Sequence, residues 1–223
     1  PGRLVVLCGS RPAETRRLAR PLLRAAQLFV QRTTGWEART VVSPALPASS
    51  REPLLREAQE HAIEVEEGHP VEGAAPSLES YDLALVASGT ACLEAAMSGT
   101  PPVIAYRFDA LTALAARAVV KTAHIGLPNI VLGRRAFPEL LQAEVTPEGI
   151  ARAAQELTAE LERAAADCRS VRAAFSIADG TCFGRRMADR VEGCCGGEAQ
   201  RESRDGTGMD ASGAGERDSS LEA

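Results

Sequence analysis

Residues 88–107 read Ser-Gly-Thr-Ala-Cys-Leu-Glu-Ala-Ala-Met-Ser-Gly-Thr-Pro-Pro-Val-Ile-Ala-Tyr-Arg. The stretch follows an apolar run at 83–87 and has the pattern of a strand end, a tight turn, a short helix, a second tight turn and a second strand. A strand–helix–strand unit of this kind is typical of a parallel sheet. The stretch therefore predicts an α/β fold.

Glu94 is the one charged residue in the helix predicted within this stretch. Charged side chains are rarely buried without a partner, so a carboxylate among small and apolar residues favours a ligand that carries hydroxyl groups. A solvated Glu on a half-exposed helix explains the same pattern, because Glu is a good helix former. The turn at 88–90 would direct backbone N–H groups and a helix N-terminus toward the same space, where a phosphate is stabilised.

The rest of the chain alternates strands with helices and contains no hairpin signal. Pro21 is expected to interrupt the first helical pattern, leaving a short turn of helix and a main helix that begins at Pro21. The other expected elements are strands at 3–8, 39–42, 62–65 and 102–106, helices at 51–61, 110–120, 147–166 and 181–192, a loop at 124–129 and a short segment at 137–144. The pattern predicts a Rossmann-like domain over 1–195, with a parallel sheet wrapped by helices on both faces, and a disordered polar tail over 196–223.

Composition excludes several classes of function. The chain has 223 residues, a net charge of −5 and 4% aromatic residues, which argues against a nucleic-acid partner. Its six cysteines form no Cys-x-x-Cys pair and no zinc-finger spacing with histidine, so no metal site is expected. Cys8 and Cys92 lie in apolar stretches, a pattern typical of a reducing compartment, and we expect a cytoplasmic location and no cofactor. No signal-peptide pattern and no membrane-spanning run is present.

Two glycine-containing loops carry the chemistry that points to a ligand. Gly9-Ser10-Arg11 follows the first strand, and Ser88-Gly89-Thr90 follows the strand before the Glu94 helix. In a doubly wound sheet, ligands bind at the carboxyl ends of strands, and arginine grips phosphate in bidentate fashion. Neither a dinucleotide fingerprint nor a Walker loop is present. The remaining interpretation is that a diphosphate binds between the two loops and that a carboxylate binds the ribose.

Several motifs occur together in one order. They are Gly-Ser-Arg-x-x-Glu at 9–14, Ser-Gly-Thr-Ala-x-Leu-Glu at 88–94, Tyr-Arg at 106–107, Val-Lys-Thr at 120–122, Leu-Pro-Asn at 127–129 and Pro-Glu-Leu-Leu-Gln at 138–142. Over about 3–192 the chain resembles the C-terminal, UDP-binding half of the lipid-A-disaccharide synthases, two-domain glycosyltransferases of the GT-B fold.

The resemblance implies a reaction and a set of contacts. The family transfers a diacylglucosamine from its UDP derivative to diacylglucosamine 1-phosphate, forming a β-1,6 disaccharide. Ser10 and Arg11 would contact the diphosphate, and Glu94 would accept hydrogen bonds from the ribose. The nucleotide cleft would be lined by Gly9 from one loop and by Ser88, Gly89 and Thr90 from the other. Arg107 and Lys121 either neutralise phosphate or are solvated charges. Asn129 and Gln142 either contact the ligand or serve loop and helix packing.

The family's N-terminal domain, with its Gly-Glu-x-Ser-Gly-Asp segment, has no counterpart in this sequence. The acceptor site and the general base are expected in that domain, so the catalytic residues are unknown and the chain alone is expected to be inactive. A lipid substrate implies peripheral contact with the inner membrane. Two alternatives stay open: another glycosyltransferase acting on a UDP-sugar, such as the enzyme that builds lipid II, and a non-catalytic nucleotide-binding module.

Overall fold

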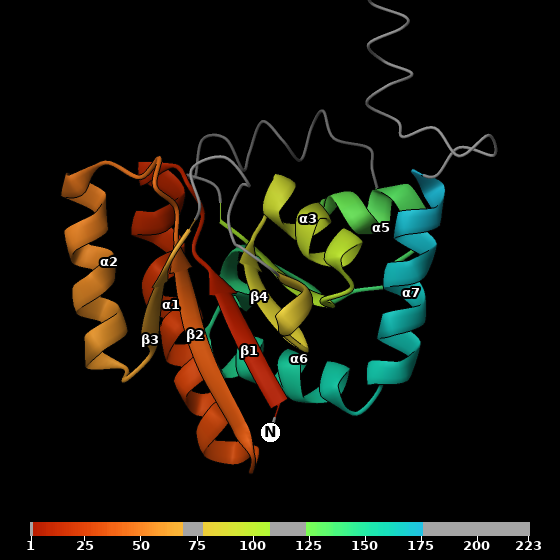
Figure 1. The fold of residues 1–223 in the computed structure, drawn as a ribbon, viewed down its shortest axis with the longest axis horizontal. Coiled ribbons are helices and arrows are strands. Elements are labelled where there is room, and N and C mark those ends of the chain that lie inside the picture. Colours follow the sequence, from red (N-terminus) through yellow and green to blue (C-terminus); the bar gives the residue numbers. More distant parts are fainter. Residues whose placement is uncertain (1, 69–77, 108–123, 176–223) are drawn as a thin grey trace, which may run out of the picture. The chain divides into compact units, whose positions relative to one another are not determined.

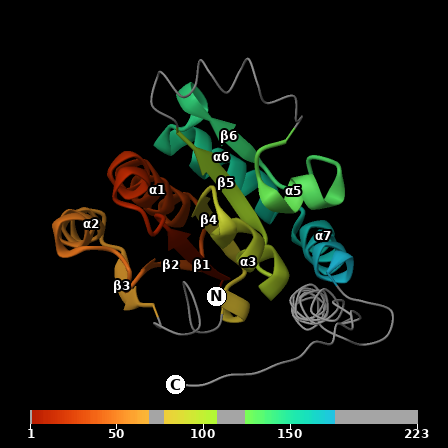
Figure 2. The same ribbon diagram turned by 90° about the horizontal axis from the view of Figure 1, so that it is seen from above.

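The protein contains a six-stranded sheet in which every strand pair is parallel, in the order β3-β2-β1-β4-β5-β6 (Figure 1 and Figure 2). The computed structural model describes residues 2–68, 78–107 and 124–175, which belong to one compact unit spanning Pro1–Phe175. The strands are β1 (Gly2–Leu7), β2 (Trp36–Val42), β3 (Glu64–Glu67), β4 (Leu83–Ala87), β5 (Pro102–Tyr106) and β6 (Glu139–Leu141). The predicted α/β class with a parallel sheet is confirmed.

Helices cover both faces of the sheet (Figure 2). Along β1, Leu4 and Val6 pack toward α1 (Pro12–Arg32), α2 (Ala48–Glu60) and α6 (Pro147–Thr158). Val5 and Leu7 belong to the opposite core, with α3 (Thr90–Ser98), α5 (Leu127–Leu132) and α7 (Leu161–Ala174). Because successive strand residues point to opposite faces, a continuous apolar strand feeds both cores. Two short 3-10 turns lie at Leu78–Ser80 and Gln142–Glu144.

The prediction of a helix break at Pro21 is wrong, because α1 runs without interruption through this proline. A proline inside a helix removes one hydrogen bond and costs about 3 kcal/mol. Leu18, Leu22 and Leu23 around Pro21 are essentially inaccessible to solvent. Burial of one such side chain contributes about 1.5–3 kcal/mol, so the packing of α1 on the sheet outweighs the local cost.

The single helix predicted over 147–166 is also wrong. The structure has two helices there, separated at Ala159–Glu160. The chain changes direction because α6 packs on the face of the sheet that α1 also covers. Cys168 and Val171 of α7 belong to the core on the opposite face of the sheet. The predicted loop at 124–129 contains the start of α5, and the segment at 137–144 contains β6.

The helices predicted at 110–120 and 181–192, the domain boundary at 195 and the polar tail lie outside the described residues, as does Lys121. Among the described helices, none has the length and apolarity needed to cross a bilayer.

Candidate functional site

The two predicted ligand loops lie next to each other at the carboxyl edge of the sheet. β1 pairs with β2 on one side and with β4 on the other, so the strand order reverses between β1 and β4. Leu7 and Val86 are register partners near the ends of these strands, and the loops at 9–11 and 88–90 leave from there. Such a reversal point is where open α/β sheets bind ligands. The structure therefore brings Gly9, Ser10 and Arg11 together with Ser88, Gly89 and Thr90.

The loop after β1 depends on the absence of a side chain at Gly9. Its φ is +94°, and a Cβ added there would lie 2.9 Å from Oε2 of Glu14 and 3.2 Å from Cβ of Glu14. The Thr15 hydroxyl donates to the carbonyl of Gly9 (3.3 Å) and to that of Arg11 (3.2 Å). These contacts hold the loop against the first turn of α1, which has Pro12 at its start and no side-chain cap.

Arg11 extends from this loop into solvent. Its Nη1 donates to Oε1 of Glu14 at 3.0 Å, with 78% of the arginine side chain exposed. An ion pair this exposed contributes little to stability, so Arg11 can exchange Glu14 for an anionic ligand at small cost. Tyr106, at the end of β5, lies in the field of both charges: burial raises its pKa, the Glu14 carboxylate raises it further, and Arg11 lowers it.

The loop after β4 presents an open helix N-terminus. The Ser88 amide donates to the carbonyl of Ala105 at 2.9 Å, which fixes the loop to β5. Gly89 has φ +154°, and a Cβ built on it would meet nothing within 4 Å. The Cys92 thiol donates to the Gly89 carbonyl at 2.9 Å, and burial raises the pKa of this thiol. Since α3 has neither a side-chain cap nor an acidic residue in its first turn, its N–H groups are available to an anion.

Glu94 lies on the exposed side of α3, while Ala95 and Ala96 next to it are buried. Among the described residues, no side-chain hydrogen bond or ion pair involves Glu94, and the residue is exposed, so its carboxylate is accessible to a ligand. Its role in ribose binding stays a prediction.

Arg107 and Gln142 lie at the same carboxyl edge, beyond β5 and β6. The Arg107 guanidinium donates to two backbone carbonyls, through Nη2 to Val145 (2.7 Å) and through Nε to Gln142 (3.4 Å). Two of its donor nitrogens, Nε and Nη2, are thus used by the polypeptide.

Asn129 is buried and joins two segments of the chain. Its Oδ1 accepts from the amides of Ala136 and Phe137, both at 2.9 Å, and its Nδ2 donates to the Phe137 carbonyl and to Oε1 of Glu139, both at 2.8 Å. These bonds are those of a packing residue, one of the two roles considered for Asn129.

Sequence reasoning included Glu139 only as part of the motif at 138–142 and gave it no role, although it lies at the centre of this arrangement. Glu139 is 7% exposed as a residue, and its carboxylate also accepts from the amides of Ile125 (3.2 Å) and Gly126 (2.9 Å), at the N-terminus of α5. A Cβ on Gly126 would lie 2.4 Å from Cδ1 of Ile104, so the Ile104 side chain would have to shift to admit any larger residue there. A carboxylate between apolar residues was the available signal, and it is the same signal that singled out Glu94.

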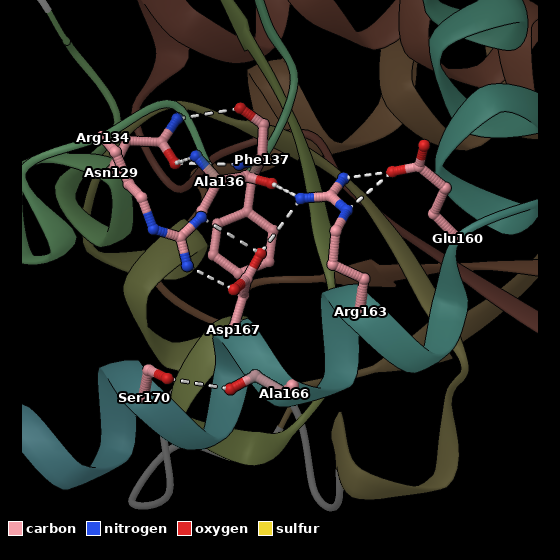
Figure 3. Close-up of polar contacts among 9 residues, drawn as sticks. All are labelled: Asn129, Arg134, Ala136, Phe137, Glu160, Arg163, Ala166, Asp167 and Ser170. Carbon is pink, nitrogen blue, oxygen red and sulfur yellow. Dashed lines mark hydrogen bonds and ion pairs between the residues drawn. The ribbon is translucent and has the colours of Figure 1, made fainter.

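A second buried carboxylate, Asp167 of α7, was also missed by sequence reasoning (Figure 3). Arg134 reaches it through Nη2 (2.5 Å), and Arg163 through Nη1 (3.2 Å). Nη1 of Arg163 also donates to the Ala136 carbonyl (3.4 Å). The cluster ties α7 to the segment that Asn129 holds. Within the described ranges no group of three His, Cys, Asp or Glu side chains is arranged to hold a metal.

Comparison with known proteins shows which family the sequence belongs to. The family model described as lipid-A-disaccharide synthetase matches residues 2–179. The chain belongs to that family.

Curated lipid-A-disaccharide synthases support the assignment. The protein of Anaeromyxobacter sp. (strain K) is 35% identical over 175 residues, which are 77% of this chain and 45% of the relative. That of Myxococcus xanthus (strain DK1622) is 39% identical over 151 residues, 66% of this chain and 37% of the relative. That of Salmonella agona (strain SL483) is 38% identical over 157 residues, which are 70% of this chain and 40% of the relative. The chain thus spans less than half the length of these relatives.

Among solved structures, similar chains include the pneumococcal O-GlcNAc transferase GtfA in complex with UDP and GlcNAc, with TM-score 0.49, 13% identity and coverage of 78% of this chain and 33% of that one. MurG of Acinetobacter baumannii has a TM-score of 0.48 and 16% identity, and the match covers 77% of this chain and 47% of MurG.

Proposed function

We propose that this chain is the UDP-binding part of a lipid-A-disaccharide synthase. The complete enzyme would transfer diacylglucosamine from UDP-2,3-diacylglucosamine to 2,3-diacylglucosamine 1-phosphate, forming the β-1,6 disaccharide and releasing UDP. The observation that carries this proposal is the pair of loops at 9–11 and 88–90 on either side of the strand reversal, within a chain that belongs to the synthase family.

The diphosphate would lie between the two loops. The uncapped N-terminus of α3 offers backbone N–H groups and the positive end of a helix dipole, and Gly89 allows the ligand to approach the backbone. Arg11 would leave Glu14 and pair with the diphosphate. Glu94, on the exposed side of α3, would accept hydrogen bonds from the ribose hydroxyls.

The chemistry of this part of the enzyme would be stabilisation of the leaving group. As the bond between sugar and diphosphate breaks, negative charge accumulates on UDP, and Arg11 together with the α3 N-terminus would stabilise that charge. Removal of a proton from the acceptor hydroxyl needs a positioned base. We assign the base and the acceptor site to the part of the relatives that this chain does not match, and peripheral contact with the inner membrane to the complete enzyme.

Calorimetric titration of the chain with UDP, UMP and uridine tests the proposal. The chain is expected to bind UDP more tightly than UMP. Glu94→Gln should weaken UDP and uridine alike by about 1–3 kcal/mol, the range for loss of a charged hydrogen-bond acceptor. Arg11→Ala should weaken UDP and leave uridine nearly unchanged, because only UDP carries the diphosphate.

Two exposed residues provide matched controls. Glu162→Gln on α7 and Arg56→Ala on α2 make the same charge changes and should leave the affinity for UDP unchanged. Equal UDP affinity in the original chain and in Glu94→Gln would return Glu94 to the role of a solvated helix residue. Absence of UDP binding by the original chain would overturn the proposal. Formation of disaccharide by the chain alone would contradict the assignment of the base elsewhere.

A further inference from the structure

Glu14, the last residue of the motif at 9–14, places a negative charge beside the proposed diphosphate site. Its Oε1 lies 3.0 Å from Nη1 of Arg11. Its side chain is also folded over the loop after β1, because a Cβ built on Gly9 would lie 2.9 Å from Oε2 of Glu14 and 3.5 Å from Cβ of Ala87. The carboxylate therefore lies where this loop meets the end of β4.

The charge of Glu14 acts on the carboxyl edge of the sheet. The Glu14 carboxylate raises the pKa of Tyr106, at the end of β5, and Arg11 lowers it. The Glu14 side chain is 29% exposed, so solvent screens its charge only in part. Glu14 is also the acidic residue in the first turn of α1, whereas the first turn of α3 contains none. The N-terminus of α1 thus has a carboxylate of its own.

A bound diphosphate would leave Glu14 without its counter-charge. Arg11 is the more mobile partner, with 78% of its side chain exposed, and in the proposed complex it turns from Glu14 to the diphosphate. Glu14 stays in the first turn of α1, with its side chain against Gly9. Its carboxylate then faces the ligand across the distance over which Arg11 changes partner, and it repels the ligand.

The strength of this repulsion depends on which nucleotide is bound. In a nucleotide sugar the terminal phosphate is esterified by the sugar. In UDP that phosphate is free, and its second ionisation has a pKa of about 6, so UDP carries nearly one more negative charge at pH 8. A carboxylate near the diphosphate therefore destabilises bound UDP more than the bound nucleotide sugar.

We propose that Glu14 is a specificity-determining residue, which weakens the binding of UDP more than that of the nucleotide sugar and so favours exchange of the product for the next donor. The inference rests on the proposed function, because it takes both ligands from that reaction. Arg11 and the N-terminus of α3 attract the diphosphate in either form. Glu14 subtracts from this attraction by an amount that increases with the charge of the ligand, so the leaving group is stabilised without being retained.

Calorimetric titration of Glu14→Gln at pH 8 with uridine, UDP-N-acetylglucosamine and UDP tests the proposal with ligands of increasing charge. Uridine should bind as it does to the original chain, and UDP-N-acetylglucosamine should bind more tightly, because Arg11 no longer has to leave a carboxylate. UDP should gain a further factor of about 3- to 10-fold, the effect of one unit charge at roughly 6 Å and an effective dielectric constant of about 40–80, between the values for a protein surface and for water. High salt should reduce this further gain.

Two variants serve as controls. Glu14→Asp keeps the charge, so its ratio of UDP affinity to UDP-N-acetylglucosamine affinity should stay close to that of the original chain. Glu162→Gln removes an acidic residue from the first turn of α7, which begins where α6 ends, and should leave the ratio unchanged. Melting temperatures establish that each variant folds.

The outcomes separate this inference from the proposed function. If Glu14→Gln leaves the ratio of the two affinities unchanged, the inference is overturned. Weaker binding of both nucleotides by Glu14→Gln also overturns it, because Glu14 would then hold Arg11 in place for the ligand. Both results leave the proposed function intact, since the original chain still binds the nucleotides. If the original chain binds neither nucleotide, the proposed function fails, and this inference fails with it.

Discussion

Replacing Asn129 by alanine tests whether this residue, expected from sequence either to contact the ligand or to pack, is structural. Asn129 is completely buried and forms four hydrogen bonds. The Ala136 amide keeps a second acceptor, the Arg134 carbonyl at 2.9 Å, and Glu139 keeps the amides of Ile125 and Gly126. Asn129→Ala thus removes the acceptor of the Phe137 N–H and the donor to the Phe137 carbonyl.

The magnitude follows from these two groups. A buried polar group without a partner costs roughly 1–3 kcal/mol, so Asn129→Ala should lower the free energy of unfolding by about 2–6 kcal/mol. That is a large part of the 5–15 kcal/mol typical of a domain. At about 2–4 °C per kcal/mol for a domain of this size, the melting temperature should fall by on the order of 10 °C. Urea denaturation followed by circular dichroism measures the loss.

Asn129→Asp is a nearly isosteric comparison. One oxygen of the introduced carboxyl would still accept from the amides of Ala136 and Phe137, while the other would face Oε1 of Glu139, an acceptor. Burial and this like charge raise the pKa of the introduced carboxyl. Below that pKa the neutral carboxyl can donate to Glu139, so the deficit relative to the original chain should shrink as the pH falls. A loss under about 1 kcal/mol in Asn129→Ala, with weaker UDP binding, would refute the structural role and favour ligand contact.

Three further predictions follow from single contacts. Gly126→Ala should destabilise the chain by about 1–3 kcal/mol in urea denaturation, because its Cβ would lie 2.4 Å from Cδ1 of Ile104, and Ile104→Val should recover part of the loss only if that clash is the cause. Burial raises the pKa of the Cys8 thiol to about 12, so iodoacetamide should leave this thiol unmodified in the folded chain and alkylate it in urea, as measured by mass spectrometry. Equal rates of alkylation in the folded and the unfolded chain would contradict the burial of Cys8. The Glu14 carboxylate disfavours the Tyr106 phenolate, so Glu14→Gln should lower the pKa of Tyr106 in an NMR titration, and an unchanged value would place Glu14 too far away to act.

The architecture was predictable wherever long apolar runs alternate with helical patterns. β4 and β5 are buried along nearly their whole length and β1 from Leu4 to Leu7, so these stretches are continuous apolar runs. β6 was missed because it has only three residues and begins with Glu139, whose burial depends on amide donors from 13 and 14 positions earlier in the chain. No local pattern contains that information.

The two wrong helix predictions have a common cause. At Pro21 the local rule predicted a break, and contacts of α1 with the sheet outweighed it. At Ala159–Glu160 no local rule predicted a break, and the need to cover both faces of the sheet produced one. In both places tertiary packing decided against local propensity.

The candidate site was predictable to the level of loops, because a glycine after a strand marks a backbone turn at the carboxyl edge. The direction of individual side chains was not predictable. Arg107 donates to carbonyls 35 and 38 residues later in the chain, and this pairing exists only once β5 and β6 lie side by side.

The N-termini of α5 and α3 differ in whether the protein itself supplies a negative charge there. At α5 the protein supplies its own anion, since the Glu139 carboxylate accepts from the amides of Ile125 and Gly126. At α3 the first turn contains no acidic residue and the helix has no side-chain cap. Both helices expose the same kind of N–H groups, which favour a negative charge. Because α3 begins at the reversal of strand order and has no acidic residue in its first turn, it is the helix N-terminus to which we assign the diphosphate of the proposed ligand.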